Sequence, residues 1–454
     1  MFRSGELVKV CRGKLICGRP EAAFEGISLD SRLIKPEQAF LAIKGKNFDG
    51  HNFIAEAINK GAKCIIAEPK IEPALLCQKQ AAIITVKDTI RALGDIARHH
   101  RKKFNLPVIV VTGSNGKTTT KEMIAWVMSA GFKVLKNQGT KNNQIGLPQA
   151  LLGLDDSYDL AVLEAGTSHF GEIDYLGKIA CPNIGVIINI GPSHLERLKN
   201  LAGVFREKTA LLKCLLAPKI AIVNYDDSLL RKLSYSKKSR PMIFGFGLRH
   251  KSDFSARHVR LVGAKVEFLL RQQKFCLNTL GLFNASNALA AIALARVFGM
   301  EYSLIAERLE SFSFLRNRLN LMEINHLKFI NDTYNSNPLS LDQALDALNS
   351  LQAKGRKIFV MGDMLELGQE KDAFHRQAGL KAAGTCNLFV TVGDLSRKAA
   401  EAARSCGFEA GNIYSCATNL EAREVLYKKI SPGPDDVILV KGSRGMRMEE
   451  IFND

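Results

Sequence analysis

Residues 113–119 have the composition and spacing of a phosphate-binding loop. They begin at the last residue of an apolar, β-branched run at 108–113 and are Gly113, Ser114, Asn115, Gly116, Lys117, Thr118 and Thr119. Glycines let backbone N–H groups turn toward an anion, and the N-terminus of a following helix adds roughly half a positive charge. Lys117 is then expected to reach the terminal phosphates of ATP, and the Thr118 hydroxyl to bind Mg²⁺. An ordinary strand-to-helix turn is the alternative, but the strand, loop and helix signals all favour an ATP site.

Two further polar residues follow predicted buried strands. Glu164 ends the run 160–163, and His194 comes shortly after the run 184–189. Ligands of parallel sheets bind at the carboxyl ends of the strands, so we expect both residues near the phosphate loop. The Glu164 carboxylate is a candidate ligand of Mg²⁺, and the His194 imidazole is a candidate metal ligand. A solvated strand-end carboxylate and a structural histidine are the alternatives.

The elements that would position these residues indicate an α/β protein. Apolar runs without polar alternation, separated by helical patterns, are typical of parallel strands covered on both faces. Near the N-terminus, the pattern predicts strands at 38–43 and 63–67 and helices at 51–60 and 89–103. Central strands are expected at 108–113, 160–163, 184–189 and 220–224, with helices at 119–130 and 204–216. Residues 254–280 alternate more, which predicts an antiparallel addition before an alanine-rich helix at 284–298.

The last third of the chain repeats the alternation of strand and helix. Strands are predicted at 357–361, 388–392, 412–415 and 437–440, and a helix at 339–351. This pattern indicates a second doubly wound, Rossmann-like sheet. At roughly 150 residues per domain, the length allows three domains. We predict a small α/β N-terminal domain at 1–87, a central P-loop domain with a parallel sheet at 88–312 and a Rossmann-like C-terminal domain at 313–454.

Composition limits the classes of function. The 63 basic and 45 acidic residues give a net charge of +18, but the basic clusters at 98–103 and 237–240 are short and lack interleaved aromatics. We therefore expect no nucleic-acid binding and attribute the charge to clefts for anionic substrates. The ten cysteines are scattered without a CxxC pair, which favours free thiols in a reducing cytosol. With no signal peptide and no apolar run of roughly 20 residues, we expect a cytoplasmic protein without a membrane span.

Three motifs together resemble the Mur ligases, the ATP-dependent amide-forming enzymes of peptidoglycan precursor synthesis. Thr-Gly-Ser-Asn-Gly-Lys-Thr-Thr-Thr at 112–120 resembles their ATP loop. Asn-Ile-Gly-Pro-Ser-His-Leu-Glu at 189–196 resembles their second central motif, and Gly-Leu-Phe-Asn-Ala-Ser-Asn-Ala-Leu-Ala at 281–290 is similar to their adenine-side helix start. The resemblance covers all three predicted domains in family order.

Further stretches resemble the family members that extend a tripeptide precursor with D-alanyl-D-alanine. These are Asp-Ser-Arg at 30–32 with the stretch 40–51, Asn-Asp-Thr-Tyr-Asn-Ser-Asn-Pro at 331–338, Met-Gly-Asp-Met-Leu-Glu-Leu-Gly at 361–368 with His375, and Val-Lys-Gly-Ser-Arg at 440–444. Sister enzymes that add a diamino acid or lysine usually carry Asp-Asn-Pro-Arg, which the chain lacks. Folylpolyglutamate synthetases share the fold but lack the Asp-Ser-Arg domain. The chain departs from the family pattern at Gln144, Ser193, Asn317 and Ser336.

The resemblance implies an ADP-forming ligase that joins D-alanyl-D-alanine to UDP-N-acetylmuramoyl-tripeptide through an acyl phosphate. It implies catalytic roles for Lys117, Glu164, His194 and Lys208, with a second metal ion at His194. Lys208 occupies the position of the family's carbamylated lysine, whereas its sequence context alone indicates a solvated lysine on a helix. Burial near metals lowers the pKa of a lysine, which makes the neutral amine available to CO₂.

The same resemblance implies the remaining contacts. Asn284 and Asn287 are expected near adenine, Arg318 and Asp332 at ATP, and Asn335 and Asn337 on the D-alanyl-D-alanine side. UDP-sugar binding is implied for Ser28, Asp30, Ser31, Arg32, Lys44 and Gly45. We expect a monomer.

The alternatives to this function are the sister ligase that adds the third amino acid and a nucleotide-binding protein without ligase activity. A nucleotide-binding protein without ligase activity would not need Glu164, His194 and Lys208 together.

Overall fold

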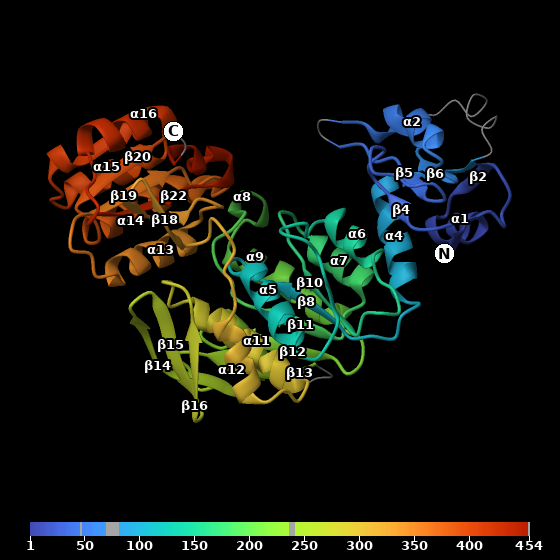
Figure 1. Ribbon diagram of the computed structural model, residues 1–454, viewed down its shortest axis with the longest axis horizontal. Coiled ribbons are helices and arrows are strands. Elements are labelled where there is room, and N and C mark those ends of the chain that lie inside the picture. The colour runs from blue at the N-terminus through green and yellow to red at the C-terminus, as the bar shows by residue number, and fades with distance from the viewer. Residues whose placement is uncertain (46–47, 70–80, 236–240, 453–454) are drawn as a thin grey trace.

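The computed structural model describes residues 1–45, 48–69, 81–235 and 241–452, and these form three lobes. Figure 1 shows the N-terminal and C-terminal lobes at opposite ends, with the central lobe between them. Each lobe has its own sheet with an apolar cluster on either face. The predicted α/β class is confirmed, and the domain boundaries stay a prediction. Residues 46–47 of the stretch 40–51 and the basic cluster 237–240 lie outside the described residues.

The N-terminal lobe contains a five-stranded sheet in the order β2-β7-β6-β5-β4. Strands β4 to β7 are parallel to one another, and β2 is antiparallel to β7. The elements are β1 (Phe2–Arg3), α1 (Ser4–Cys11), β2 (Lys14–Cys17), β3 (Ala23–Phe24), β4 (Ile27–Ser28), β5 (Ala39–Leu41), α2 (Ile54–Asn59), β6 (Cys64–Ala67), β7 (Ala82–Thr85) and α4 (Thr89–Arg101). Helix α4 contacts α1 and also the central helices α6 and α7, so it joins the two lobes (Figure 1).

The central lobe contains a nine-stranded sheet in the order β16-β15-β14-β13-β12-β11-β8-β10-β9. Its strands are β8 (Val108–Thr112), β9 (Val134–Lys136), β10 (Leu160–Glu164), β11 (Ile184–Ile187), β12 (Ile220–Asn224), β13 (Met242–Gly247), β14 (Phe254–Val262), β15 (Lys265–Leu270) and β16 (Gln273–Leu277). Its helices are α5 (Lys117–Met128), α6 (Gly146–Leu151), α7 (Glu172–Ala180), α8 (Leu195–Leu198), α9 (Leu201–Thr209), α10 (Ser228–Arg231), α11 (Asn284–Val297) and α12 (Tyr302–Glu310). Strands β14 to β16 pair antiparallel, which confirms the predicted addition.

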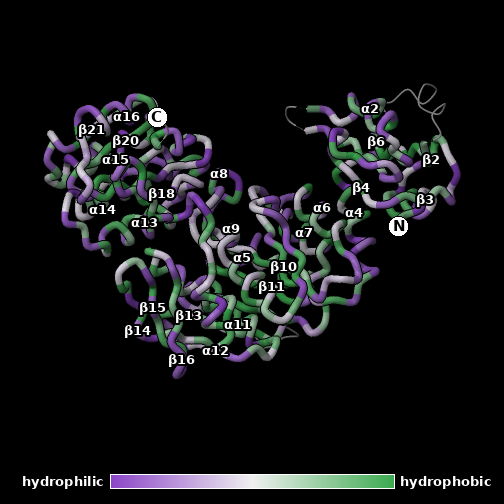
Figure 2. The backbone as a smooth tube through the Cα atoms, in the orientation of Figure 1, coloured by the Kyte–Doolittle hydropathy of each residue, from purple (hydrophilic) through white to green (hydrophobic). Residues whose placement is uncertain are grey.

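Strand β8 shows why the central strands lack polar alternation. Ile109 and Val111 pack in the cluster formed with α5 and α11, while Val108 and Val110 pack on the opposite face with α6 and α7. All four are at most 1% exposed. In Figure 2 the hydrophobic residues concentrate along the central strands and α11. A strand covered on both faces needs apolar residues at every position, as predicted.

The C-terminal lobe contains a six-stranded sheet in the order β17-β18-β22-β19-β20-β21. Its elements are β17 (Asn320–Ile324), β18 (Leu327–Asp332), α13 (Pro338–Ser350), β19 (Lys357–Gly362), α14 (Lys371–Ala383), β20 (Leu388–Val392), α15 (Ser396–Ser405), β21 (Ile413–Cys416), α16 (Asn419–Glu424) and β22 (Val437–Lys441). The hairpin β17–β18 was not predicted. Its turn residues Asn325 and His326 have φ of 49° and 66°, and this pair lacks the glycine that usually marks such a turn.

Three other expectations need correction. The helix expected at 119–130 begins earlier, at Lys117, and the one expected at 204–216 ends at Thr209 and continues as a 3₁₀ turn.

Free thiols are confirmed for Cys11, Cys64, Cys181, Cys214, Cys276, Cys386, Cys406 and Cys416. The expectation is wrong for Cys17, which is disulfide-bonded, because spacing along the chain does not reveal which thiols meet in space. Every helix in the described ranges is too short or too polar to cross a membrane.

Lys121 on α5 is a buried lysine that fixes the loop after β9. Its Nζ atom donates hydrogen bonds to the carbonyl oxygens of Asn137, at 2.6 Å, and Gly139, at 3.0 Å, and lies 2.8 Å from the Glu122 carboxylate. The Asn137 side chain in turn bonds the backbone N–H and C=O of Glu164. Lys121 therefore holds this loop against the end of β10.

We expect Lys121→Met to lower the free energy of unfolding of the central lobe by about 1–3 kcal/mol, because buried carbonyl oxygens lose their donor. Trp126, the single tryptophan, lies on the same helix, so its fluorescence during urea denaturation measures the change. Lys136→Met is the control, since Lys136 pairs with the same Glu122 but is 45% exposed, and we expect a loss of about 0–1 kcal/mol. Equal losses in the two variants would contradict the role assigned to Lys121.

Candidate active site

The turn between β8 and α5 is the predicted phosphate-binding loop. It lies at the carboxyl edge of the central sheet, where β8 ends at Thr112 and α5 begins at Lys117. Gly116 has φ of 78°, and an added Cβ would lie 2.6 Å from the side-chain oxygen of Asn287. Glycine is therefore favoured here by the left-handed backbone and also by the close approach of another side chain. This turn places the N-terminus of α5 at the sheet edge, where it can bind an anion.

The motif at 189–196 supports this loop from a neighbouring strand. The Ser114 N–H donates to the Asn189 C=O at 3.1 Å, and the Asn115 N–H donates to the Asn189 side-chain oxygen at 2.9 Å. The Ser114 hydroxyl donates to the Gly191 C=O at 2.9 Å. Strand β11, which precedes this motif, pairs in parallel with β8. Two motifs that are distant in the sequence therefore form one rigid edge.

A cavity lies at this edge of the sheet, and Lys117 is one of the residues that line it. Its ammonium group points back toward the loop. Nζ donates to the carbonyl oxygens of Gly113, at 3.0 Å, and Ser114, at 3.1 Å. Burial lowers the pKa of Lys117, the Glu164 charge opposes this shift, and the Arg318 charge adds to it. Charge-assisted bonds to phosphate are stronger than bonds to neutral carbonyls, so a phosphate in the cavity can replace these two partners.

Glu164 ends β10, and one of its carboxylate oxygens has no hydrogen-bond partner among the described residues. Its residue surface is 1% exposed. Oε1 accepts a hydrogen bond of 2.5 Å from the Asn142 side-chain amide, whereas Oε2 is buried without a bond to any described residue. A buried acceptor without a donor costs about 1–3 kcal/mol, and more when it is charged. A hard cation such as Mg²⁺ at Oε2 would satisfy it, so the residue fits the predicted metal role.

His194 directly precedes α8 and has a left-handed backbone, with φ of 52°. It lines the same cavity as Lys117. Its Nδ1 atom lies 2.6 Å from Oε2 of Glu366, a residue of the C-terminal lobe. Burial lowers the pKa of His194, and the opposing charge of Glu366 does not reverse this shift. The ring is therefore mainly neutral at pH 7, which is the form that binds metals.

Lys208 on α9 is a buried cation without an anionic partner in the part of the chain that the structure describes. The residue is 2% exposed, and its ammonium has no hydrogen bond or ion pair within the described residues. Burial lowers its pKa well below the ordinary value, and repulsion from Lys117 adds to the effect. It does not line the cavity, but its charge also lowers the pKa of His194. An unpaired buried ammonium is costly, so this position favours the neutral amine.

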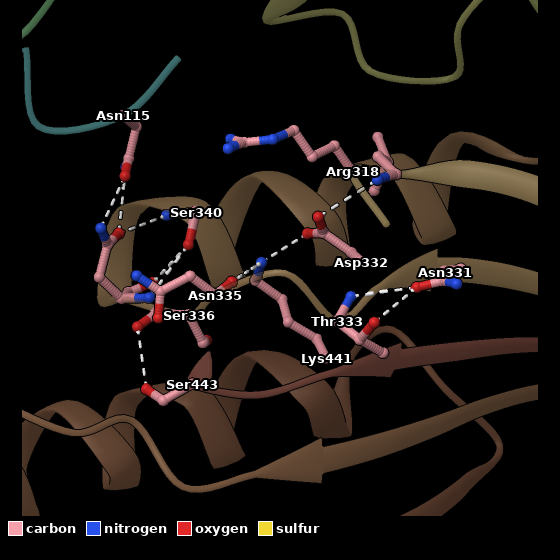
Figure 3. A network of polar contacts seen from close by, with 12 residues as sticks. Asn115, Arg318, Asn331, Asp332, Thr333, Asn335, Ser336, Ser340, Lys441 and Ser443 are labelled. Atoms are coloured by element: carbon pink, nitrogen blue, oxygen red, sulfur yellow. Dashed lines mark hydrogen bonds and ion pairs between the residues drawn. The ribbon is translucent and has the colours of Figure 1, made fainter. Parts of the chain in front are cut away.

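The C-terminal lobe contacts the phosphate loop through polar side chains (Figure 3). Asn115 and Asn337 exchange side-chain amide hydrogen bonds of 3.0 and 2.6 Å. Nη2 of Arg318 donates to the Thr118 hydroxyl at 3.1 Å, and its guanidinium lies 4.0 Å from the centre of the Tyr334 ring. These contacts place a C-terminal cation directly beside the loop.

Asp332 and Lys441 form the buried part of this network (Figure 3). Nζ of Lys441 lies 2.5 Å from Oδ2 of Asp332 and donates to the Asn335 C=O at 3.0 Å. Burial raises the pKa of Asp332, and the Lys441 charge counteracts this shift. Oδ1 of Asp332 accepts from the Leu319 N–H at 3.2 Å. The Asp332–Lys441 pair therefore fixes the backbone at Leu319, next to Arg318.

One cavity brings together most of the residues predicted for ATP, metal and D-alanyl-D-alanine. The predicted residues that line it are Ser114, Asn115, Gly116, Lys117, Thr118, Thr119, Glu164, His194, Asn284, Arg318, Asp332, Asn335 and Asn337. Gly113, Asn287 and Lys208 do not line it. Asn287 instead donates to the Asn284 side-chain oxygen at 2.9 Å and supports that residue from behind. The roles of all these residues stay predictions.

The residues predicted to bind the UDP-sugar lie in the N-terminal lobe and do not line this cavity. They are Ser28, Asp30, Ser31, Arg32, Lys44 and Gly45. Ser28 ends β4, and Lys44 follows β5. Because β4 and β5 are parallel neighbours, their carboxyl ends meet at one edge, where ligands of such sheets bind. Asp30 accepts bonds of 2.9 and 2.7 Å from the Arg32 guanidinium, which orders the turn at this edge.

The site residues that were not predicted include Asn142, Glu366 and Lys441. The last two lie in motifs quoted above, at 361–368 and 440–444, but spacing does not show which side chain of a motif reaches the cavity. The described residues contain no group of three or more His, Cys, Asp or Glu side chains that could hold a metal. A metal here would therefore also need the Thr118 hydroxyl or a modified Lys208.

Comparisons with known proteins cover nearly the whole chain. Family models match at residues 23–101 (Mur ligase family, catalytic domain), 111–295 (Mur ligase middle domain) and 317–444 (Mur ligase, glutamate ligase domain). The chain is 33% identical over 438 residues to the UDP-N-acetylmuramoyl-tripeptide–D-alanyl-D-alanine ligase of Bacillus subtilis (strain 168), covering 96% of this chain and 93% of that protein. The protein of the same name from Escherichia coli (strain K12) is 32% identical over 439 residues, covering 95% and 93%.

Solved structures agree with the sequence comparisons. MurF from Acinetobacter baumannii superimposes with a TM-score of 0.88 at 32% identity, covering 99% of this chain and 97% of that chain. MurF ligase from Thermotoga maritima, in complex with ADP, gives a TM-score of 0.83 at 26% identity, covering 95% and 97%. Since the models, relatives and structures all extend across the three lobes, the chain belongs to the Mur ligase family.

Proposed function

We propose that this protein is an ATP-dependent ligase that joins D-alanyl-D-alanine to UDP-N-acetylmuramoyl-tripeptide. The products are the pentapeptide precursor of peptidoglycan, ADP and phosphate. The observation that carries the proposal is the cavity that combines the phosphate loop, the unpartnered Glu164 oxygen and polar groups of the C-terminal lobe. The relatives named for this reaction, matched over nearly their full length, support the choice of substrates.

A carboxylate is a poor electrophile at neutral pH, so the reaction has to activate it. A carboxylate oxygen of the tripeptide attacks the γ-phosphorus of ATP, ADP leaves, and an acyl phosphate forms. The amine of D-alanyl-D-alanine then attacks the acyl carbon. The tetrahedral intermediate loses phosphate and a proton and becomes the amide. Phosphoryl transfer depends mostly on positioning and charge neutralisation, which the cations of this cavity provide.

Both the phosphate loop and the C-terminal lobe would contact ATP. We propose that Lys117 leaves the loop carbonyls and binds the terminal phosphates, while the loop amides cradle them. Arg318, held over Tyr334, would add a second positive charge from the opposite side. Asn284, supported by Asn287, would lie near adenine, and Asp332 would lie near the nucleotide.

Thr118 and Glu164 would hold the Mg²⁺ ion of the nucleotide, and His194 would hold a second metal ion, with Lys208 as a carbamate that supplies further oxygen ligands. When bound, Mg²⁺ neutralises the charge of the transferring phosphates. The free Oε2 of Glu164 and the neutral ring of His194 support this assignment. The position of Lys208 supports carbamylation, because the resulting anion would face Lys117 in place of a repelling ammonium.

The remaining ligands would bind at the edges of the cavity and in the N-terminal lobe. We propose Asn335 and Asn337 for the D-alanyl-D-alanine side, although Asn337 bonds Asn115 in this structure. The carboxyl edge of β4 and β5 would bind the UDP-sugar. We also propose that the protein acts in the cytoplasm, as a monomer and without nucleic acid.

The choice of amine tests the function directly. D-Alanyl-D-alanine is expected to stimulate ADP release with UDP-N-acetylmuramoyl-tripeptide, because residues 331–338 and the relatives both point to that reaction. Diaminopimelate or lysine is expected to give no stimulation with the corresponding UDP-dipeptide. A coupled assay of ADP release measures both pairs. The reverse pattern would assign the protein to the sister reaction.

Glu164→Gln is expected to lower kcat about 10²–10³-fold, because the shape is kept but the anionic oxygen is lost. The concentration of Mg²⁺ needed for half-maximal ADP release is expected to rise. Glu267→Gln is the control, since this carboxylate is also mostly covered, at 15% exposure, but lies on β15 away from the cavity. A Glu164→Gln variant with the wild-type dependence on Mg²⁺ would refute the metal role.

Lys208→Ala is expected to lose most of the activity, and acetate to restore part of it by filling the vacated oxygen position. Because burial lowers the pKa of Lys208 well below its ordinary value, its neutral amine becomes available to CO₂, and acidification should protonate it and lower the activity. Nuclear magnetic resonance of protein exposed to ¹³CO₂ detects the carbamate. Lys213→Ala, at an exposed position just beyond α9, is the control. Normal turnover of Lys208→Ala would contradict the role, and active protein without a carbamate signal would contradict the modification.

A further inference from the structure

The loop between β19 and α14 reaches from the C-terminal lobe onto the central lobe. It carries the motif at 361–368, to which the proposed reaction assigns no role. At its far end, Gly368 has φ of 64°, and an added Cβ would lie 3.3 Å from backbone atoms of Glu196. Glu196 belongs to α8, the helix that His194 precedes. The loop therefore rests directly against the helix that positions His194.

Side chains of the C-terminal lobe hold this loop in shape. The Met364 N–H donates to Nε2 of His375 at 3.0 Å, and Nδ1 of His375 donates to the Lys371 C=O at 2.6 Å. The Leu365 N–H donates to the Ser443 hydroxyl at 2.9 Å. His375 has no exposed surface, and burial lowers its pKa, so the neutral ring keeps Nε2 as an acceptor. The backbone that leads to the tip of the loop is thus fixed by its own lobe.

Glu366 is the residue that this loop presents to His194. Its backbone is left-handed, with φ of 62°, and its Oε2 lies 2.6 Å from Nδ1 of His194. A carboxylate in this position accepts the Nδ1 proton, which leaves the lone pair of the neutral ring on Nε2. The Glu366 side chain is 60% exposed, so the contact contributes little to folding stability. Its effect falls on the orientation and the tautomer of His194.

We propose that Glu366 is a positioning residue through which docking of the C-terminal lobe completes the metal site at His194. The inference rests on the metal role of His194 in the proposed function. Metal-binding histidines commonly donate their second N–H to a carboxylate, which fixes the tautomer and raises the basicity of the ligand. Here the carboxylate comes from a different lobe, so the ring is fully prepared only when that lobe is docked. Metal binding and docking then strengthen each other by the same factor.

The test measures Mn²⁺ binding to the full-length protein with ADP, by electron paramagnetic resonance of the free ion. The site in question is the class of bound Mn²⁺ that His194→Ala removes. Glu366→Ala is expected to weaken that class about tenfold. Glu366→Gln is expected to bind within about threefold of wild type, because its amide oxygen still accepts from Nδ1. Glu370→Gln, at an exposed position on the same connection, is the matched control and should bind like wild type.

The outcomes separate this inference from the proposal that supports it. Trp126 fluorescence during urea denaturation should be unchanged in both Glu366 variants, which confirms that they fold. Wild-type Mn²⁺ affinity in Glu366→Ala would overturn the positioning role and leave His194 as a ligand. Undiminished Mn²⁺ binding in His194→Ala would refute the metal role of His194, and the inference with it.

Discussion

Uncompensated charge around the phosphate loop is the constraint on which the rest of the structure depends. Within the described ranges, Lys117 bonds only to carbonyl oxygens, Lys208 has no anionic partner, and Glu164 keeps one buried oxygen without a donor. Such groups reduce stability, so the surrounding fold has to hold them in place. The ends of β8, β10 and β11 lie side by side at one edge of the central sheet and hold these charged groups in place. A nucleotide with its metal would supply the missing counter-charges.

The C-terminal lobe also brings polar and charged side chains to the residues around the cavity, from the side opposite the phosphate loop. Asn337 contacts the loop, Arg318 brings a cation to Thr118, and Glu366 brings a carboxylate to His194. These three contacts are polar, and polar contacts between partly exposed groups contribute little energy each. Such a weak interface is compatible with relative motion of the two lobes, as is common between domains of one chain. The ligands, more than the interface, would then decide the docked state.

Several parts of the site could be predicted because they follow local rules. Glu164 and His194 each come after a buried apolar run, and parallel strands share one carboxyl edge. The hairpin β17–β18 escaped prediction, since its turn uses Asn325 and His326 without a glycine. Lys121 escaped it as well, because a lysine on a predicted helix is normally solvated, whereas here it bonds the carbonyls of a distant loop.

By itself, the sequence determined the α/β class, many of the strands and helices, the strand, loop and helix around residues 113–119, and the family. These depend on periodicity and motifs, which are properties of short segments. Only the tertiary structure decided that Asn142 occupies one oxygen of Glu164 and leaves the other free. It also decided that Glu366 meets His194. The physical reason is that a hydrogen-bond partner depends on where distant segments pack to within a fraction of an ångström, and spacing along the chain does not encode that distance.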